Sequence, residues 1–146
     1  MEQPTDFLLS RATRSWRRLL DLELRPQGVT YATWVTLAYL RRGGDGLLQK
    51  DLAQLLAIEA PTLVRMLDRL EREGLVDRRP VESDRRAKTV HLTPEAHKVL
   101  GTFDAIAGRM REHLLAGISN EELATTHQVL TRIVANAEQH FGSEKS

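Results

Sequence analysis

The residues best suited to chemistry lie on one side of a predicted helix, Pro61 to Glu73, which proline opens. Arginine can bond guanine at two points, threonine can bond a base or a phosphate, and an apolar group can contact the methyl of thymine. The helix N-terminus also favours phosphate. Five side chains of these types share the side opposite the apolar stripe: Thr62, Arg65, Met66, Arg69 and Arg72. Their spacing predicts a helix that reads the major groove of DNA.

Acidic residues on the same helix leave a plainer interpretation open. Asp68, Glu71 and Glu73 could pair with the arginines three or four residues away, as on any solvated helix face.

A second basic group follows in a predicted hairpin. Residues 78–88 hold five basic and two acidic side chains, and the tip reads Asp84, Arg85, Arg86, Ala87, Lys88. A long cation at such a tip can enter the minor groove while its neighbours neutralise phosphates. A charged turn that only protects the hairpin edge from aggregation is the alternative. Together with the preceding helices, the tip favours DNA binding.

Other kinds of site lack their residues. The chain has no cysteine, which excludes disulfides, thiolate nucleophiles and sensing by thiol oxidation. The five histidines are scattered, without metal-ligand spacing, and there is no serine elbow, phosphate loop or carboxylate pair. We therefore expect no catalytic residue, no metal and no cofactor.

The elements that position the basic residues follow from the apolar spacing. Helices are predicted at Thr5–Leu24, at Gln49–Leu56 and from Tyr31 to before Gly43, the last with Thr30 as cap and a stripe of Tyr31, Trp34, Val35 and Ala38. Leu47 and Leu48 form a short strand, and residues 75–79 and 88–92 form the hairpin. Thr93 and Pro94 start a long helix, and Ser119 with Glu122 caps the last one.

This order predicts a mainly α (α+β) fold. Residues 30–93 hold a winged helix-turn-helix for DNA binding, and residues 1–29 with 94–146 form a helical dimerisation region. The long apolar stripes of these outer helices must be buried, and their length favours burial on a second chain.

Length and composition limit the number of domains and the kinds of partner. With 146 residues, 41% of them hydrophobic, the chain suits one compact domain. No apolar run approaches the roughly 20 residues that cross a membrane. The start, Met1 to Asp6, lacks the features of a secretory signal, so we expect a cytoplasmic protein without a membrane partner. The net charge of +1 does not by itself point to nucleic acid.

The sequence resembles the MarR family of bacterial winged-helix regulators, and most closely its SlyA branch. The resemblance covers nearly the whole chain and is carried by Pro61-Thr62-Leu63-Val64-Arg65, by Leu67, Asp68, Leu70, Gly74 and Leu75, and by Asp84-Arg85-Arg86-Ala87-Lys88. It implies a homodimer, associated with the bacterial nucleoid, that reads a pseudo-palindromic operator. Thr62, Arg65, Met66 and Arg69 would then face the major groove. Either Arg85 or Arg86 would enter the minor groove, with the other held by Asp84.

The resemblance also implies an effector. Many members of the family are released from DNA by small aromatic or phenolic acids bound between the dimerisation helices and the winged region. The matching positions here are Trp34 and Arg65, with Trp16 or Arg17 as neighbours. A ring stacked on tryptophan with its carboxylate on arginine is sound chemistry. Alternatively, both tryptophans only pack in the core.

The sequence thus predicts a homodimeric, sequence-specific transcriptional regulator, acting as a repressor or an activator. The main alternative is a winged-helix module whose arginines bind an acidic protein instead of DNA. An enzyme is the weakest alternative, because it would need a nucleophile or a metal cluster.

Overall fold

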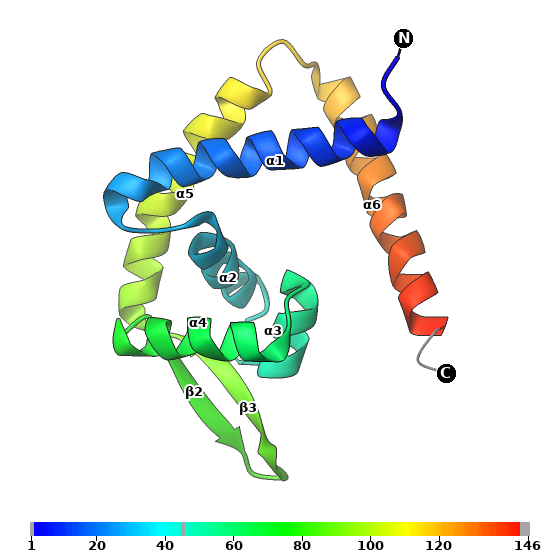
Figure 1. Ribbon diagram of the computed structural model, residues 1–146. Helices are drawn as coiled ribbons and strands as arrows, with labels where there is room; N and C mark the ends of the chain where they lie inside the picture. Colours follow the sequence, from blue (N-terminus) through cyan, green and yellow to red (C-terminus); the bar gives the residue numbers. More distant parts are fainter. Residues whose placement is uncertain (1, 45, 144–146) are drawn as a thin grey trace. The chain divides into compact units, whose positions relative to one another are not determined.

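The computed structural model describes residues 2–44 and 46–143. Met1, Asp45 and residues 144–146 lie outside this range, so the ends of the predicted dimerisation region are not covered. The described residues form six α-helices, one short 3-10 helix and a three-stranded antiparallel sheet of order β1-β3-β2 (Figure 1). In chain order they are α1 Thr5–Leu24, η1 Arg25–Gln27, α2 Tyr31–Arg42, β1 Leu47–Leu48, α3 Gln49–Leu56, α4 Ala60–Arg72, β2 Val76–Val81, β3 Asp84–Leu92, α5 Pro94–Leu114 and α6 Asn120–Ser143. The predicted winged-helix class is confirmed.

One hydrophobic core holds the winged region together with α1 and α5. Its buried side chains come from α1 to α5 and from the strands, and they include Leu20, Leu52, Leu67, Val90 and Leu100, each at most 1% exposed. The side chains that coat α4 on its inner side thus meet apolar partners from several other elements. Burial of this kind stabilises each large aliphatic side chain by about 1.5–3 kcal/mol.

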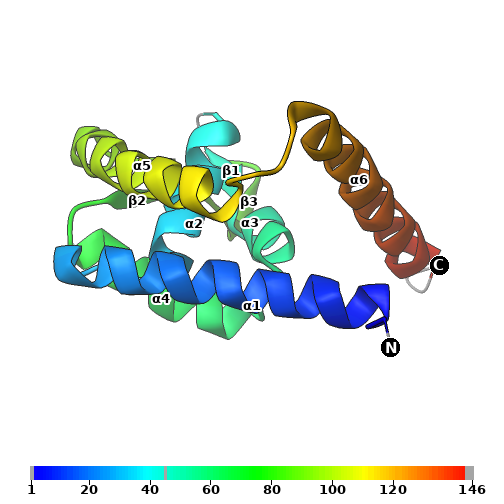
Figure 2. The same cartoon turned by 90° about the horizontal axis from the view of Figure 1, so that it is seen from above.

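The helix α2 lies between α1 and α4 in Figure 1, and α5 flanks it in the view from above (Figure 2). Asp21 of α1 accepts a hydrogen bond from the backbone N–H of Tyr31, at 2.6 Å. On the α5 side, Arg41 pairs with Asp104 at 2.6 Å. The predicted Thr30 cap is confirmed, because its hydroxyl accepts from the N–H of Thr33. The helix is therefore fixed on several sides.

The predicted apolar stripe of α2 was placed on the wrong face. Tyr31, Trp34, Val35 and Ala38 are only half-buried, whereas the opposite face carries the buried residues Thr33, Thr36, Leu37 and Leu40. The two threonines misled the pattern, because a hydroxyl counts as polar. Their hydroxyls are satisfied inside the fold: that of Thr36 donates to the carbonyl of Ala32 at 2.7 Å.

The hairpin of β2 and β3 projects beyond α3 and α4 (Figure 1) and is longer than the sequence predicted. The eight-residue tip expected at 80–87 is wrong, since Val81 already pairs with Asp84. The register shifts directly after Pro80. Proline lacks the N–H that a ladder needs, so an irregularity there is expected. Residues 85–87 fall between the pairs Pro80–Lys88 and Val81–Asp84 and form the bulge.

The chain divides into two compact units, one that ends at Arg111 and one that begins at Glu112. The predicted boundaries at residues 30 and 93 therefore do not separate compact units within one chain, and the functional division at those residues stays a prediction. The predicted Ser119–Glu122 capping box is formed, with bonds of 2.7 and 3.2 Å. No described residue of α6 is buried. No helix within 2–44 and 46–143 is long and apolar enough to cross a membrane.

Candidate nucleic-acid interface

The predicted recognition helix is α4, and its ends follow local rules. It begins at Ala60, so Pro61 is the second residue instead of the predicted first, still within the turn where proline is tolerated. It ends at Arg72, and Gly74, just beyond the C-cap residue Glu73, has a left-handed φ of 74°, as expected for the residue that closes a helix. The N–H of Leu75 bonds the carbonyl of Leu70 at 2.9 Å and closes the last turn. The start of the hairpin is therefore tied to the end of α4.

The inner side of α4 is the predicted one. Leu63, Leu67 and Leu70 are fully buried, and Val64 is half-buried beside them. Because these residues fix the rotation of the helix, Pro61, Thr62, Arg65 and Arg72 are exposed on the other side.

Arg65 is an exposed cation of α4 with only one weak contact. Its Nη2 donates to the hydroxyl of Thr62 at 3.4 Å, a long bond. Across the described residues, Arg65 forms no ion pair with an acid. The predicted pairing of α4 arginines with α4 acids occurs only between Arg69 and Glu73, at 4.0 Å.

Two predicted recognition residues face α2 instead of open solvent. Met66 is half-buried, and its sulfur lies in contact with the Thr36 hydroxyl oxygen at 3.1 Å. Arg69 is partly exposed, but its Nη2 donates to Thr33 at 2.7 Å. Both residues lie on the edge of the polar face next to the buried leucines, within reach of α2. The prediction that they project freely is wrong for Met66 and only half right for Arg69.

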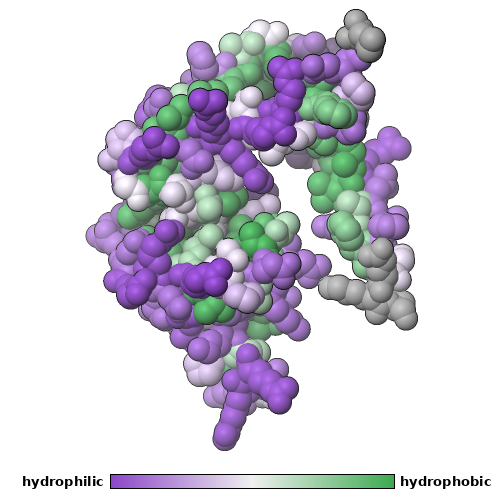
Figure 3. Space-filling model, in the orientation of Figure 1, coloured by the Kyte–Doolittle hydropathy of each residue, from purple (hydrophilic) through white to green (hydrophobic). Residues whose placement is uncertain are grey.

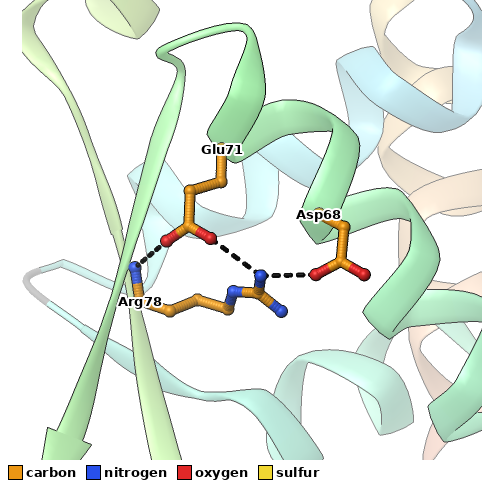
Figure 4. A network of polar contacts seen from close by, with 3 residues as sticks. All are labelled: Asp68, Glu71 and Arg78. Atoms are coloured by element: carbon orange, nitrogen blue, oxygen red, sulfur yellow. Dashed lines mark hydrogen bonds and ion pairs between the residues drawn. The ribbon is translucent and has the colours of Figure 1, made fainter.

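The acids on the other edge of α4 are bound by a residue outside the helix. Arg78 of β2 donates from Nη2 to Asp68 at 2.5 Å and to Glu71 at 2.7 Å (Figure 4). Glu71 also accepts the backbone N–H of Arg78 at 3.2 Å, which satisfies the outer edge of β2. The hydrogen bond from Arg78 lowers the pKa of Glu71 and raises the pKa of the Arg78 guanidinium. This three-residue contact, the Arg78 clamp, joins the hairpin to α4.

The hairpin tip carries the other predicted DNA residues. Arg85 and Arg86 are exposed in the bulge, and Lys88 is exposed opposite Pro80. Asp84 accepts the backbone N–H of Arg86 at 2.9 Å and so fixes the turn. The ion pair between Asp84 and an arginine side chain, which the resemblance implies, is not formed among the described residues. Figure 3 shows the tip as strongly hydrophilic.

A cavity of about 590 Å³ separates this hairpin from α3 and α4. Its lining combines cations from three elements with one acid, Asp84, and apolar side chains such as Val64: the cations are Lys50 of α3, Arg78 of β2, and Arg86 and Lys88 of β3. Positive charge therefore collects between the helices and the wing. Lys50 was not predicted, although its position in the first turn of α3 is a signal that the sequence offers.

The four predicted effector residues are not brought into one cavity among those described. Arg17 lies over the ring of Tyr31 at 5.2 Å, and Tyr31 contacts Trp34 with 5.9 Å between ring centroids. Trp16 and Trp34 pack against the core, in agreement with the plainer interpretation. Arg17 lines a cavity of about 500 Å³ that none of the other three lines. The indole N–H of Trp34 is buried and has no hydrogen-bond partner among residues 2–44 and 46–143.

A metal or catalytic centre was not predicted. Within residues 2–44 and 46–143, no three His, Cys, Asp or Glu side chains gather closely enough to hold an ion. The candidate interface gathers exposed arginines, two lysines and Thr62, which are groups that bind phosphates and base edges.

The sequence and the fold are both similar to those of known proteins. A sequence model described as MarR family matches residues 27–87. Transcriptional regulator PA3341 is 43% identical, with a TM-score of 0.84 over 93% of this chain and 99% of that one. MepR from S. aureus, solved as a DNA complex, is 29% identical, with a TM-score of 0.80 over 92% and 99%. A MarR variant from E. coli, solved with operator DNA, is 27% identical, with a TM-score of 0.79 over 89% and 93%.

Proposed function

Since the chain belongs to the MarR family of transcriptional regulators, which are not enzymes, we propose that it binds double-stranded DNA as a homodimer. In this proposal α4 enters the major groove, and Arg85 or Arg86 enters the minor groove. The observation that carries it is a pair of exposed basic groups, on α4 and at the wing tip, on elements that one core and the Arg78 clamp hold together. The similar MepR and MarR proteins were solved with DNA.

Thr62 and Arg65 are the proposed base readers. Both are exposed in the first turns of α4, where base edges lie closest when a helix enters the groove. Pro61 and the helix N-terminus would approach a phosphate. Met66 and Arg69 both contact α2. Met66 would add an apolar contact with a base, and the part of the Arg69 guanidinium that is not bonded to Thr33 would contact DNA. Asp84 orders the turn, and Arg85, Arg86 and Lys88 supply the charge.

A second copy of the chain is the proposed partner. α6 exposes a row of large apolar residues, visible along this helix in Figure 3: Val129, Leu130, Ile133, Val134 and Phe141. Soluble proteins rarely leave such a row uncovered. Two copies would set two recognition helices about 34 Å apart, one helical turn of DNA, and so favour a pseudo-palindromic operator.

Substitution of Arg65 tests the base-reading role. Against a duplex of about 40 base pairs from upstream of the chain's own gene, Arg65→Ala should weaken binding by roughly 1–3 kcal/mol and relax base preference. Arg109→Ala is the matched control, because it removes an exposed arginine of α5 that forms no ion pair with any described residue. Equal loss of affinity for all sequences would assign Arg65 to a phosphate, and no loss would remove α4 from the interface.

The wing is tested by salt. Arg85→Ala with Arg86→Ala should flatten the dependence of affinity on salt concentration, because fewer counterions are released. An unchanged slope would mean that the wing does not touch DNA. A native chain that binds no duplex but captures acidic proteins would support the interaction module instead.

Release by a small aromatic acid also belongs to this proposal. Arg17 and the unpartnered indole N–H of Trp34, linked through Tyr31, offer a cation and a donor to a carboxylate. Arg65 would have to approach from α4, and Trp16 from α1. The effector, the SlyA branch and a nucleoid location in the bacterial cytoplasm stay predictions from the resemblance.

A further inference from the structure

We propose that Arg78 is a positioning residue that sets DNA affinity without touching DNA, by binding both Asp68 and Glu71 on the edge of α4. The inference rests on the proposed function, because it concerns how α4 presents itself to a polyanion. It starts from the arrangement in Figure 4, where one guanidinium meets two carboxylates that lie one turn apart.

The contact of Arg78 with the two acids changes the charge that α4 presents to DNA. Asp68 and Glu71 stand on the same helix as Arg65, and their side chains are 48% and 40% exposed. Unpaired carboxylates beside a phosphate backbone would repel it, since opposed like charges cost affinity. The side chain of Arg78 is only 13% exposed, and its positive charge is neutralised by these two carboxylates. Arg78 is therefore poorly placed to bind a phosphate itself. The recognition helix then presents its own arginines with its acids neutralised.

Geometry adds a second effect. Glu71 holds Arg78 at two points, the side chain and the backbone N–H, on the outer edge of β2. That edge has no neighbouring strand, because the sheet order is β1-β3-β2. The bonds therefore fix the wing against α4, and with it the spacing between the groups meant for the two grooves.

The next residue on the strand provides a control. Arg79 is also an arginine, but it is exposed on the other face of the sheet, as alternation along a strand requires. It forms no ion pair with any described residue. A substitution there changes the net charge of the hairpin equally and leaves the Arg78 clamp intact.

The test is a cycle of variants on the full chain, with the same duplex as above. Arg78→Met should weaken binding about tenfold, and Arg79→Met much less. Adding Asp68→Asn and Glu71→Gln to Arg78→Met should restore affinity to within about threefold of the native chain, whereas the two amides alone should change it little. Circular dichroism shows that each variant is folded. A stoichiometric titration with duplex at a concentration far above Kd gives the fraction of each variant that can bind DNA.

Three outcomes overturn the inference. If the amides raise affinity equally with and without Arg78, then Arg78 does not neutralise the acids. If the loss in Arg78→Met persists with both amides present, neutralisation of the two acids is not what Arg78 contributes to DNA affinity. If Arg79→Met loses as much as Arg78→Met, hairpin charge alone is responsible.

The inference and the proposed function fail in different ways. If the native chain binds no duplex, both fall. If the native chain binds, and Arg65→Ala behaves as proposed, any of the three outcomes above removes only the role of Arg78. Amide exchange adds a readout without DNA: the hairpin amides of residues 84–92 should exchange faster in Arg78→Met than in Arg79→Met. Equal rates would show that the bonds do not fix the wing.

Discussion

The two compact units of the chain treat their apolar residues in opposite ways. Every fully buried hydrophobic residue that the structure describes lies between Leu20 and Ala107, in the unit that ends at Arg111. The described part of α6 carries a regular apolar row and buries none of it. Contacts within one chain bury or half-bury most described apolar residues of the first unit, and its most exposed large one, Phe7, lies in the first turn of α1. The second has the pattern of an interface, so its stability depends on what covers it.

The contrast extends to polar groups. In the winged unit, acids of α4 are bound by a residue of β2, and threonines of α2 contact side chains of α4. In α6, the described hydrogen bonds are local, such as the capping box and the bond from Thr131 to the carbonyl of His127 at 2.8 Å. Long-range contacts fix the recognition surface, and local ones only start the last helix.

The largest effect expected is loss of the winged core. Leu67 is fully buried in α4, and Leu67→Ala should destabilise the protein by about 2–5 kcal/mol, because a cavity remains. Urea unfolding measures this. The control is Leu55→Ala in α3, where the native side chain is 48% exposed and the cost should be well under half as large. Similar costs would mean that α4 is not packed as described.

The next largest effect is expected in α6, and it tests whether the exposed apolar row of this helix is a dimer interface. Ile133 is 40% exposed in one chain, and Ile133→Asp should leave a protomer folded but raise the dimer dissociation constant roughly 100-fold, because the new carboxylate would be buried. Sedimentation equilibrium gives the constant. Gln128→Asp, on the opposite side of α6, makes the same charge change and should have little effect. A native chain that is monomeric at all concentrations would contradict the proposal.

The local signals of the sequence were sufficient for most elements. α1 and α3 begin and end where the apolar spacing predicts, because an apolar stripe depends on residues only three or four positions apart. Gly74 marks the end of α4 because a left-handed residue is needed there. The buried side of α4 followed from three leucines at helical spacing. These features depend on neighbours in the chain, which the sequence displays directly.

What the sequence could not supply depends on elements far apart. The reversed face of α2 follows from packing against α4, which gives Thr33 and Thr36 their partners. The same contact turns Met66 inward. The Arg78 clamp joins residues seven and ten positions apart through the turn at Gly74, and the only sequence signal is that Asp68 and Glu71 share one helix edge. Predictions about the candidate site therefore failed where tertiary contacts chose between two polar faces.

The smallest effect is expected in the first turn of α6. It tests whether the hydrogen bonds of this unit are local, in contrast to those of the winged unit. Glu122 accepts the backbone N–H of Ser119 at 2.7 Å, and this bond lowers the pKa of the carboxyl below its ordinary value of 4.5. A carboxyl with a lowered pKa stabilises the fold above its ordinary pKa, and the effect is lost as pH falls through the folded-state value. Protection of the Ser119 amide from hydrogen exchange should therefore decrease with acid from about pH 4.5 downward.

In Glu122→Gln the cap bond can persist through the amide oxygen, but the acid step in Ser119 protection should disappear, because nothing there titrates. Glu121→Gln, next in the chain and without a cap bond, should keep the step. Stability of the winged unit should not respond to either change, since no described contact links Glu122 to it. A step that survives in Glu122→Gln would assign the acid sensitivity of α6 to another group, and a coupled loss in the winged unit would show that the first turn is not local.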